Sequence, residues 1–279
     1  MEHEKKYEPS GNHSCRTPAK KSEHLIISVH VPKTAGTSFG HSLKDHFGNS
    51  LVLKYGERLF NTPRIFRNQN ALQAAIDNVQ KDFTGIRCIH GHFLPVQYLL
   101  LCSLREVSFV TWMRHPVDRL ISDYFHTLRN YSTDAPPFQS RVLTEKWSLG
   151  KYCLCEELRN VYHQFFWGFP LEYFDFIGIT GHYQADFFYF CNRYLSPDIR
   201  IYRENVTNKN PGIPLLDDSL RKEIEQFHQK DMDLYHRAIE MRNRRMDGSL
   251  QNQAEPKENI TSKKKLIMES LFKMISKFQ

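Results

Sequence analysis

Long apolar runs are missing from the 279-residue sequence. No stretch reaches the roughly 18 consecutive apolar residues of a membrane-spanning helix, so no such span is predicted. The first residues, Met1–Cys15, also lack the apolar segment of a secretory signal. We therefore expect a cytoplasmic protein; the alternative is the Golgi lumen, if an N-terminal anchor precedes this sequence.

Cysteine motifs and nucleotide-triphosphatase motifs are missing as well. The six cysteines include no C-x-x-C pair and no His/Cys spacing typical of zinc sites. Neither a disulfide scaffold nor a metal centre is predicted, and the thiols are expected to be buried or free in a reducing compartment. The pattern G-x-x-x-x-G-K-[ST] is also absent. This disfavours a P-loop-type kinase, which stays the rival enzyme class.

The middle of the chain has little excess positive charge, although the net charge is +7. Residues 1–23 and 245–279 carry more than half of that excess, which leaves residues 24–244 only mildly basic. A mildly basic domain fits a site for small anions better than a broad surface for nucleic acid. We predict no nucleic-acid partner.

Short apolar runs alternate with helical periodicity between residues 24 and 244. Buried strands are expected at four such runs and at one shorter run: 24–31, 85–90, 106–113, 174–180 and 200–203. Helices are expected between or after them, over 39–47, 71–80, 117–128, 182–194 and 216–244. This alternation predicts an α/β domain with a central, mainly parallel sheet flanked by helices.

The two ends of the chain differ from this domain in composition. Residues 1–23 are polar and aperiodic, so we expect a disordered arm. Residues 245–262 are expected to form a polar linker, and residues 263–279 a basic amphipathic helix. That helix could pack on its own domain, associate with a second copy, or lie on an anionic membrane surface.

The segment Pro32-Lys-Thr-Ala-Gly-Thr-Ser38 joins the first strand to the first helix. Ligands of parallel α/β sheets bind beyond the carboxyl ends of strands, and a helix start favours anions. Lys33 supplies a cation, Gly36 permits close approach, and Thr34, Thr37 and Ser38 supply hydroxyls. The segment indicates a phosphate-binding loop; an ordinary strand-to-helix turn is the alternative.

A second cluster follows the strand at 106–113. Arg114 is placed at the strand end, where its guanidinium could hold a phosphate with two hydrogen bonds. Ser122 lies two turns into the next helix and could reach the same anion. For Arg119 a structural role and a binding role are equally compatible with the sequence.

These segments resemble one family of enzymes. His30–Phe39 resembles the 5′-phosphosulfate loop of Golgi-type carbohydrate sulfotransferases, and Met113–Tyr124 resembles their 3′-phosphate motif. His90-Gly-His92 resembles the catalytic segment of the heparan sulfate and uronyl 2-O-sulfotransferase group, and Asn205–Lys209 more weakly resembles the family's late cofactor-contacting loop. The resemblance covers roughly residues 24–240. One departure is His115, where the family usually has Asp.

The resemblance implies a P-loop-like sulfotransferase fold and 3′-phosphoadenosine 5′-phosphosulfate as donor, with no metal. It implies a sulfuryl transfer to a hydroxyl of a glycosaminoglycan-like or other carbohydrate acceptor. His92 would be the general base, His90 a substrate-positioning neighbour, and Lys33 the group that stabilises the leaving phosphate. Donor contacts would come from two loops and one helix: Lys33, Thr34, Ala35, Gly36, Thr37, Ser38, Arg114, Ser122, Thr207 and Lys209.

The acceptor cleft is expected in the aromatic and basic region at 130–170. Its candidates are arginines, lysines and tryptophans that suit an acidic sugar: Arg129, Arg141, Lys151, Arg159, Trp147 and Trp167. Simple packing of an irregular insertion is equally compatible with each of them. A non-catalytic nucleotide- or glycan-binding protein on the same fold is the remaining alternative.

Overall fold

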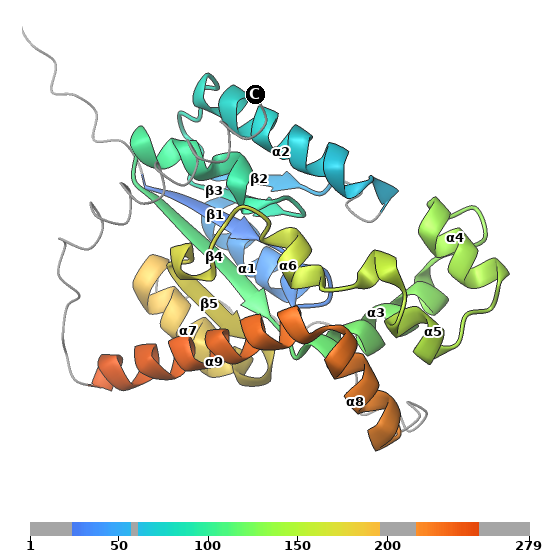
Figure 1. Cartoon of the computed structure of the whole chain (residues 1–279). Coiled ribbons are helices and arrows are strands. Elements are labelled where there is room, and N and C mark those ends of the chain that lie inside the picture. The colour runs from blue at the N-terminus through green and yellow to red at the C-terminus, as the bar shows by residue number, and fades with distance from the viewer. Residues whose placement is uncertain (1–23, 57–60, 196–215, 251–279) are drawn as a thin grey trace, which may run out of the picture.

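A five-stranded, all-parallel sheet forms the centre of the molecule. The computed structural model describes residues 24–56, 61–195 and 216–250. The strands are hydrogen-bonded in the order β2-β3-β1-β4-β5 (Figure 1). Their bounds are β1 Leu25–Val29, β2 Leu51–Lys54, β3 Cys88–Gly91, β4 Val107–Met113 and β5 Phe176–Ile179. The α/β class with a parallel central sheet is therefore confirmed.

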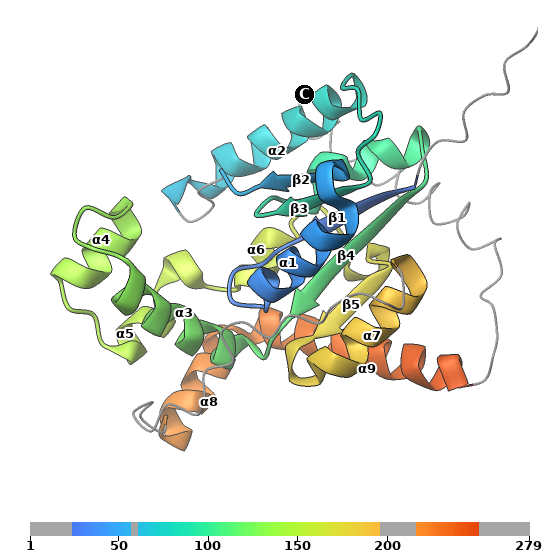
Figure 2. The same cartoon turned by 180° about the vertical axis from the view of Figure 1, so that it is seen from behind.

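Helices cover both faces of this sheet. On one face lie α1 (Gly36–Phe47) and α7 (Tyr183–Tyr194), as the view from behind shows (Figure 2). The other face carries α2 (Arg64–Val79), a 3-10 segment (Pro95–Ser103), α6 (Val161–Phe165) and α9 (Gln229–Leu250). Each face has its own apolar cluster. This two-sided cover explains why the strands are continuous apolar runs.

The first strand shows how the sequence divides between these clusters. All five side chains of β1 are buried. Leu25, Ile27 and Val29 pack in one cluster and Ile26 in the other, because successive side chains of a strand point to opposite faces. Full burial of each such apolar side chain contributes about 1.5–3 kcal/mol. Ser28 shares the face of Ile26, which becomes important for the histidines described below.

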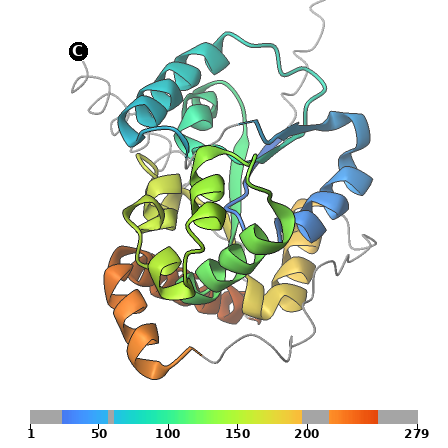
Figure 3. The ribbon, with the colours of Figure 1, turned by 90° about the vertical axis from the view of Figure 1, so that its right-hand side faces the viewer.

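The remaining helices lie beyond the carboxyl ends of the strands. They are α3 (Pro116–Asn130), α4 (Pro137–Thr144), α5 (Leu149–Cys153) and α8 (Asp218–Phe227). Viewed toward that end of the sheet, α3, α4 and α5 stand in front of it (Figure 3). The insertion expected at 130–170 is therefore largely short helices, placed over the edge where ligands of parallel sheets bind.

Several boundaries differ from those expected. The edge strand β2 was not predicted, because half of its residues are exposed and give no apolar pattern. Helix α2 begins at Arg64 rather than 71, since its first turns are mostly exposed. The helical region after 216 breaks at His228, and α9 continues to Leu250, past the expected end at 244. The arm at 1–23, the strand at 200–203 and the helix at 263–279 fall outside the described residues.

Across residues 24–56, 61–195 and 216–250, no helix combines the length and hydropathy needed to cross a bilayer.

Candidate active site

One large cavity lies at the carboxyl edge of the sheet. Its volume is about 1190 Å³. Strand β1 is the point where the chain changes direction across the sheet, because β2 and β3 lie on one side of it and β4 and β5 on the other. The loops after β1, β3 and β4 therefore meet around a crevice, which is the usual ligand position in such sheets.

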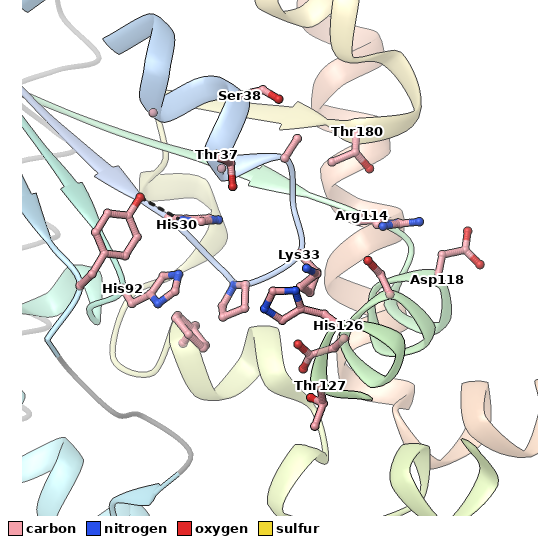
Figure 4. A pocket seen from close by; sticks show the side chains of 18 of the residues that line it. His30, Lys33, Thr37, Ser38, His92, Arg114, Asp118, His126, Thr127 and Thr180 are labelled. Carbon is pink, nitrogen blue, oxygen red and sulfur yellow. Dashed lines mark hydrogen bonds between the residues drawn. The ribbon is translucent and has the colours of Figure 1, made fainter. Parts of the chain in front are cut away.

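The cavity brings together most of the residues singled out from the sequence. Those that line it are Lys33, Ala35, Gly36, Thr37, Ser38, His92, Arg114 and Ser122 (Figure 4). Thr34 and His90 do not line it and are buried behind it. Thr207 and Lys209 fall outside the described residues. Three separate sequence motifs thus converge on one site.

The loop after β1 has an unusual backbone. Lys33 and Ala35 both adopt left-handed conformations, with φ of 71° and 64°. Such conformations cost about 1–3 kcal/mol each for residues other than glycine, and they concentrate at functional sites. Thr34, between them, is fully buried, and its hydroxyl donates to the carbonyl of Val31 at 2.8 Å. Thr34 therefore holds the turn, and its side chain does not face the cavity.

The start of α1 is open to a ligand. Ala35 is its N-cap and provides no side-chain hydrogen bond to the first turn. The first backbone N–H groups of a helix have no partners within the helix, and the helix dipole favours an anion there. Gly36, Thr37 and Ser38 of this turn line the cavity. The geometry is that of an anion-binding loop.

Two cations lie at this site, Lys33 in the loop itself and Arg114 after β4. Within the described residues, the side chains of Lys33 and Arg114 form no hydrogen bond and no ion pair. Burial and the nearby Arg129, Arg114 and Arg119 lower the pKa of Lys33, and Asp123 opposes them. In Figure 4, Lys33 lies between His92 on one side and Arg114 on the other. Two unpaired cations next to the N-terminus of a helix make a strong site for a polyanion.

The backbone of Arg114 is fixed by a tyrosine from another helix. The Tyr162 hydroxyl accepts from the N–H of Arg114 at 2.8 Å and donates to its carbonyl at 2.7 Å. Tyr162 is fully buried on α6. In turn, the Asp231 carboxylate on α9 accepts from the N–H groups of Tyr162 and His163, at 3.0 and 2.9 Å. Arg114 is thus held in place without using its guanidinium.

Arg119 takes the structural role that the sequence left open. It is 1% exposed, lies 3.7 Å from the Asp123 carboxylate, and does not line the cavity. His115 lines the cavity close to Arg114, with its Nε2 3.9 Å from the carboxylate of Glu225. Arg221 bridges Glu225 and Asp118 at 3.2 and 3.3 Å, so α8 is tied to the start of α3.

Three histidines cluster on the opposite side of the loop. The rings of His30 and His90 are stacked with centroids 5.3 Å apart, and those of His30 and His92 are 4.7 Å apart. The Tyr55 hydroxyl lies 3.3 Å from Nδ1 of His30. Sequence reasoning assigned no role to His30 or Tyr55. The position of Tyr55 directly after an unpredicted edge strand gave no signal for it.

All three imidazoles are neutral near neutral pH. Burial lowers the pKa of His92 to about 4. Burial and the nearby His92 lower the pKa of His90 to about 3. The pKa of His30 is held well below its usual value by burial and by both neighbouring histidines. Nε2 of His92 is buried and has no hydrogen-bond partner within the described residues, and the neutral ring, packed against His30 and Tyr55, lines the cavity.

His90 lies where it cannot act as a direct substrate contact. It is 1% exposed, and its Nδ1 is 2.8 Å from the hydroxyl of Ser28, its register partner on β1. Its ring lies under that of His30. His90 therefore supports the ring of His30, and its expected role as a substrate-positioning neighbour stays a prediction.

The expected acceptor residues are not at the cavity. None of Arg129, Arg141, Lys151, Arg159, Trp147 and Trp167 lines it. Three of these cations are paired within the insertion itself: Arg141 with Glu157, Lys151 with Glu145, and Arg159 with Glu156. Trp147 is buried, and its Nε1 donates to Glu145. The insertion reaches the cavity through other residues, among them Tyr131, Pro136, Phe138 and Gln139.

No group of three or more His, Cys, Asp or Glu residues in the part of the chain that the structure describes is arranged to hold a metal ion, the histidine cluster included.

Comparisons with known proteins give a distant likeness. No protein-family model matches the chain, and no curated protein matches it significantly. Among solved structures, a sulfotransferase from Alicyclobacillus acidocaldarius is similar to it, with a TM-score of 0.39 and 16% sequence identity. The likeness covers 76% of this chain and 94% of that chain. At this distance it carries no conclusion about activity, which has to rest on the side chains of the cavity.

Proposed function

We propose that this protein transfers a sulfuryl group from 3′-phosphoadenosine 5′-phosphosulfate to a hydroxyl of a carbohydrate-type acceptor. The observation that supports this most is the meeting of two features in one cavity. An anion-binding loop with two unpaired cations lies beside a neutral imidazole that has no partner. The first suits a donor rich in phosphate, and the second suits the removal of a proton from an acceptor hydroxyl.

The loop would bind the 5′ end of the donor. During transfer, the bond between sulfur and the bridging oxygen of the 5′-phosphate breaks, and negative charge grows on that oxygen. Lys33 and the N–H groups at the start of α1 would stabilise this charge. Because they are fixed before the reaction begins, their contribution is larger in the transition state than in the bound donor.

Arg114 and Ser122 would bind the 3′-phosphate. The Ser122 hydroxyl forms no hydrogen bond within the described residues, and it lines the same cavity as the Arg114 guanidinium. A bidentate arginine contact to a phosphate gives orientation as well as affinity. This contact would fix the donor so that its sulfate points toward His92.

His92 would act as the general base. The acceptor oxygen attacks sulfur, its proton passes to the imidazole of His92, and 3′,5′-adenosine bisphosphate leaves. A pKa of about 4 keeps the ring neutral and able to accept a proton over the whole neutral range. The two anionic ends of the donor would raise this pKa once bound, which makes the ring a better base in the complex.

The first test is donor binding. Thermal stabilisation by 3′,5′-adenosine bisphosphate, compared with ATP and magnesium, separates a sulfotransferase from a P-loop-type kinase. At equal ligand concentrations, we expect the bisphosphate to raise the melting temperature and ATP with magnesium to leave it unchanged. Transfer of radiolabelled sulfate from the donor to a panel of glycans then tests catalysis. Stabilisation by ATP and magnesium only would overturn the proposal, and bisphosphate binding without any transfer would leave a non-catalytic binding protein.

A further inference from the structure

The cavity has room for more than the donor. Pockets that enclose a single small ligand usually measure about 300–1,000 Å³. The cavity here measures about 1190 Å³ and continues from the loop after β1 to the insertion. If the proposed function holds, the part formed by the insertion is where the acceptor binds, and its side chains report the chemistry of that acceptor.

The wall at this end is made of aromatic and amide side chains. Asn61 precedes α2, Tyr131 follows α3, and Phe138 and Gln139 belong to the first turn of α4. The Asn61 side-chain carbonyl accepts from the N–H of Phe138 at 3.1 Å, which joins the two segments of the wall. No full charge is present among these four side chains.

This wall leaves neutral hydrogen-bonding groups unused. Within the described residues, the Asn61 side-chain NH₂ has no acceptor, and Oε1 of Gln139 is buried without a donor. An amide offers both donors and an acceptor to a hydroxyl, and an aromatic ring offers a face to the C–H groups of a sugar. Leaving a buried acceptor unpaired costs about 1–3 kcal/mol, so a hydroxyl that reached Gln139 would recover that free energy.

The proposed donor would use most of the positive charge of the cavity. Its charged lining residues in the described chain are Lys33, Lys44, Arg114, Asp118 and Asp123. Three cations and two carboxylates must accept a donor that carries two phosphates and a sulfate. An acidic acceptor would have to share these cations with the donor, and it would be repelled by Asp123 and by the donor itself. Of the four cations expected to bind it, Arg141, Lys151 and Arg159 are paired elsewhere, and Arg129 does not line the cavity.

We infer that the acceptor is an uncharged, hydroxyl-rich molecule, such as a neutral sugar, that binds against the wall formed by Asn61, Tyr131, Phe138 and Gln139. This rests on the proposed function and narrows it. It sets aside the acidic, glycosaminoglycan-like acceptor that the sequence resemblance implies, because such a chain needs free cations beside the base.

The test uses a matched pair of acceptors. A uronic acid-containing glycan and the same glycan after reduction of its carboxyl groups differ in charge and share their linkages. We expect the reduced glycan to be sulfated with at least a tenfold higher kcat/KM, and its KM to change little with salt. Screening acts on charged pairs, so an acidic acceptor bound by cations would show a KM that rises steeply with salt.

A variant and a control locate the effect. Gln139→Leu keeps the size of the side chain and removes its amide, so the acceptor KM should rise severalfold while bisphosphate affinity and melting temperature stay unchanged. Lys151→Ala removes an exposed cation of α5 outside the cavity lining, and transfer to the reduced glycan should stay unchanged.

Different failures are distinguishable. Preference for the acidic glycan, with loss of transfer in Lys151→Ala, would overturn this inference and leave the proposed function intact. A protein that binds the bisphosphate but sulfates neither glycan would overturn it too. Failure to bind the bisphosphate at all would overturn the proposed function itself.

Discussion

The ring of His30 occupies the space that a side chain on Gly36 would need. A Cβ built on Gly36 would overlap Nε2, Cδ2 and Cε1 of that ring. The φ of Gly36 is not positive, so glycine is required here by its neighbour and not by its own backbone. One missing methyl group therefore lets the anion loop and the histidine cluster lie in contact.

Gly36→Ala should damage both stability and transfer. Overpacking of this kind usually costs about 1–3 kcal/mol, and the displaced His30 would push on His92. The double variant Gly36→Ala/His30→Ala should regain part of the lost melting temperature, because the overlap is gone. Gly56→Ala is the control, since no atom of the described residues lies within 4 Å of a Cβ there. Equal melting temperatures for Gly36→Ala and Gly56→Ala would refute the steric explanation.

Lys33→Ala should lower turnover far more than donor binding. The lysine acts mainly on charge that develops on the leaving oxygen, and loss of such a preorganised group costs on the order of 10²-fold or more in rate. Lys44→Ala, an exposed cation farther along α1, should cost much less. Steady-state kinetics test this role. An unchanged kcat with only a higher KM for the donor would show that Lys33 does not stabilise the leaving group.

Arg114→Ala and Ser122→Ala should weaken the binding of 3′,5′-adenosine bisphosphate and hardly affect the binding of adenosine 5′-phosphate. Both side chains are assigned to the 3′-phosphate, and a charged hydrogen bond of this type contributes about 1.5–3 kcal/mol. For Arg114→Ala this corresponds to roughly a 10- to 100-fold loss of affinity. Calorimetry with the two nucleotides makes the comparison. Parallel losses for both would place these residues elsewhere in the pocket.

His92→Ala should remove most transfer and leave the fold intact. Loss of a general base typically costs about 10²–10⁴-fold. Melting temperature and single-turnover transfer are to be measured on the same sample, with His41→Ala, an exposed histidine of the cavity rim, as control. If His92 only packs the strand end, its variant will instead melt early and lose activity in proportion to unfolded protein.

The pH profile of the wild-type enzyme gives a second measure of His92. The free enzyme's kcat/KM should be level around neutral pH and fall only as the pH approaches the pKa of about 4. The sign follows from the chemistry, because a protonated imidazole cannot accept the acceptor's proton. A fall that begins near the ordinary histidine pKa of about 6.5 would assign the base to a more exposed group.

Acid should destabilise the fold through His228. Nε2 of this buried ring donates to the carbonyl of Cys153 at 2.7 Å, and Nδ1 accepts from the N–H of Asn160 at 3.1 Å, so no position is left for another proton. Burial lowers its pKa to about 4. The unfolded chain therefore binds a proton first as the pH falls below about 6.5. This group then costs about 1.4 kcal/mol of unfolding free energy per pH unit until the pH nears its folded pKa.

The readout is the difference between wild type and His228→Gln. Asp231, whose pKa burial raises to about 6, acts in the opposite direction over part of this range. The slope of unfolding free energy against pH in the wild type therefore combines the contributions of His228 and Asp231. Denaturant unfolding between about pH 7 and pH 5 should show a shallower loss of stability in His228→Gln than in wild type. Identical slopes would mean that His228 is protonated in the folded protein.

The sequence predicted those parts of the site that follow from the pattern of neighbouring residues, such as a buried strand and the loop after it. The run before Pro32 is apolar throughout because β1 is buried on both sides, and the loop and helix after it follow directly. Tyr55 was missed because β2 lies at the sheet edge, half exposed. Strand alternation does place His90 and His92 on one side, yet only the register with Ser28 shows that His90 lies deeper.

The sequence could not show which charged side chains of the insertion form ion pairs with one another. Arg141 and Glu157 are distant in the chain, and nothing in their spacing predicts that they meet. An arginine near tryptophans suggests a sugar site by composition alone. Because three of the four cations there have a carboxylate partner within the insertion, the same composition describes a folded insertion, and the polar wall at Asn61 and Gln139 becomes the informative feature.

The hydrogen bonds from Asp231 through Tyr162 to Arg114 also bear on how the protein is made. Arg114 is synthesised early, and the carboxylate that anchors its support comes much later, on α9. A nascent chain on the ribosome therefore lacks a finished donor site until α9 has emerged. The same dependence sets the smallest fragment worth expressing. A fragment that stops before Asp231 would keep the loop, the histidines, Arg114 and Tyr162, and would lose the carboxylate that anchors Tyr162.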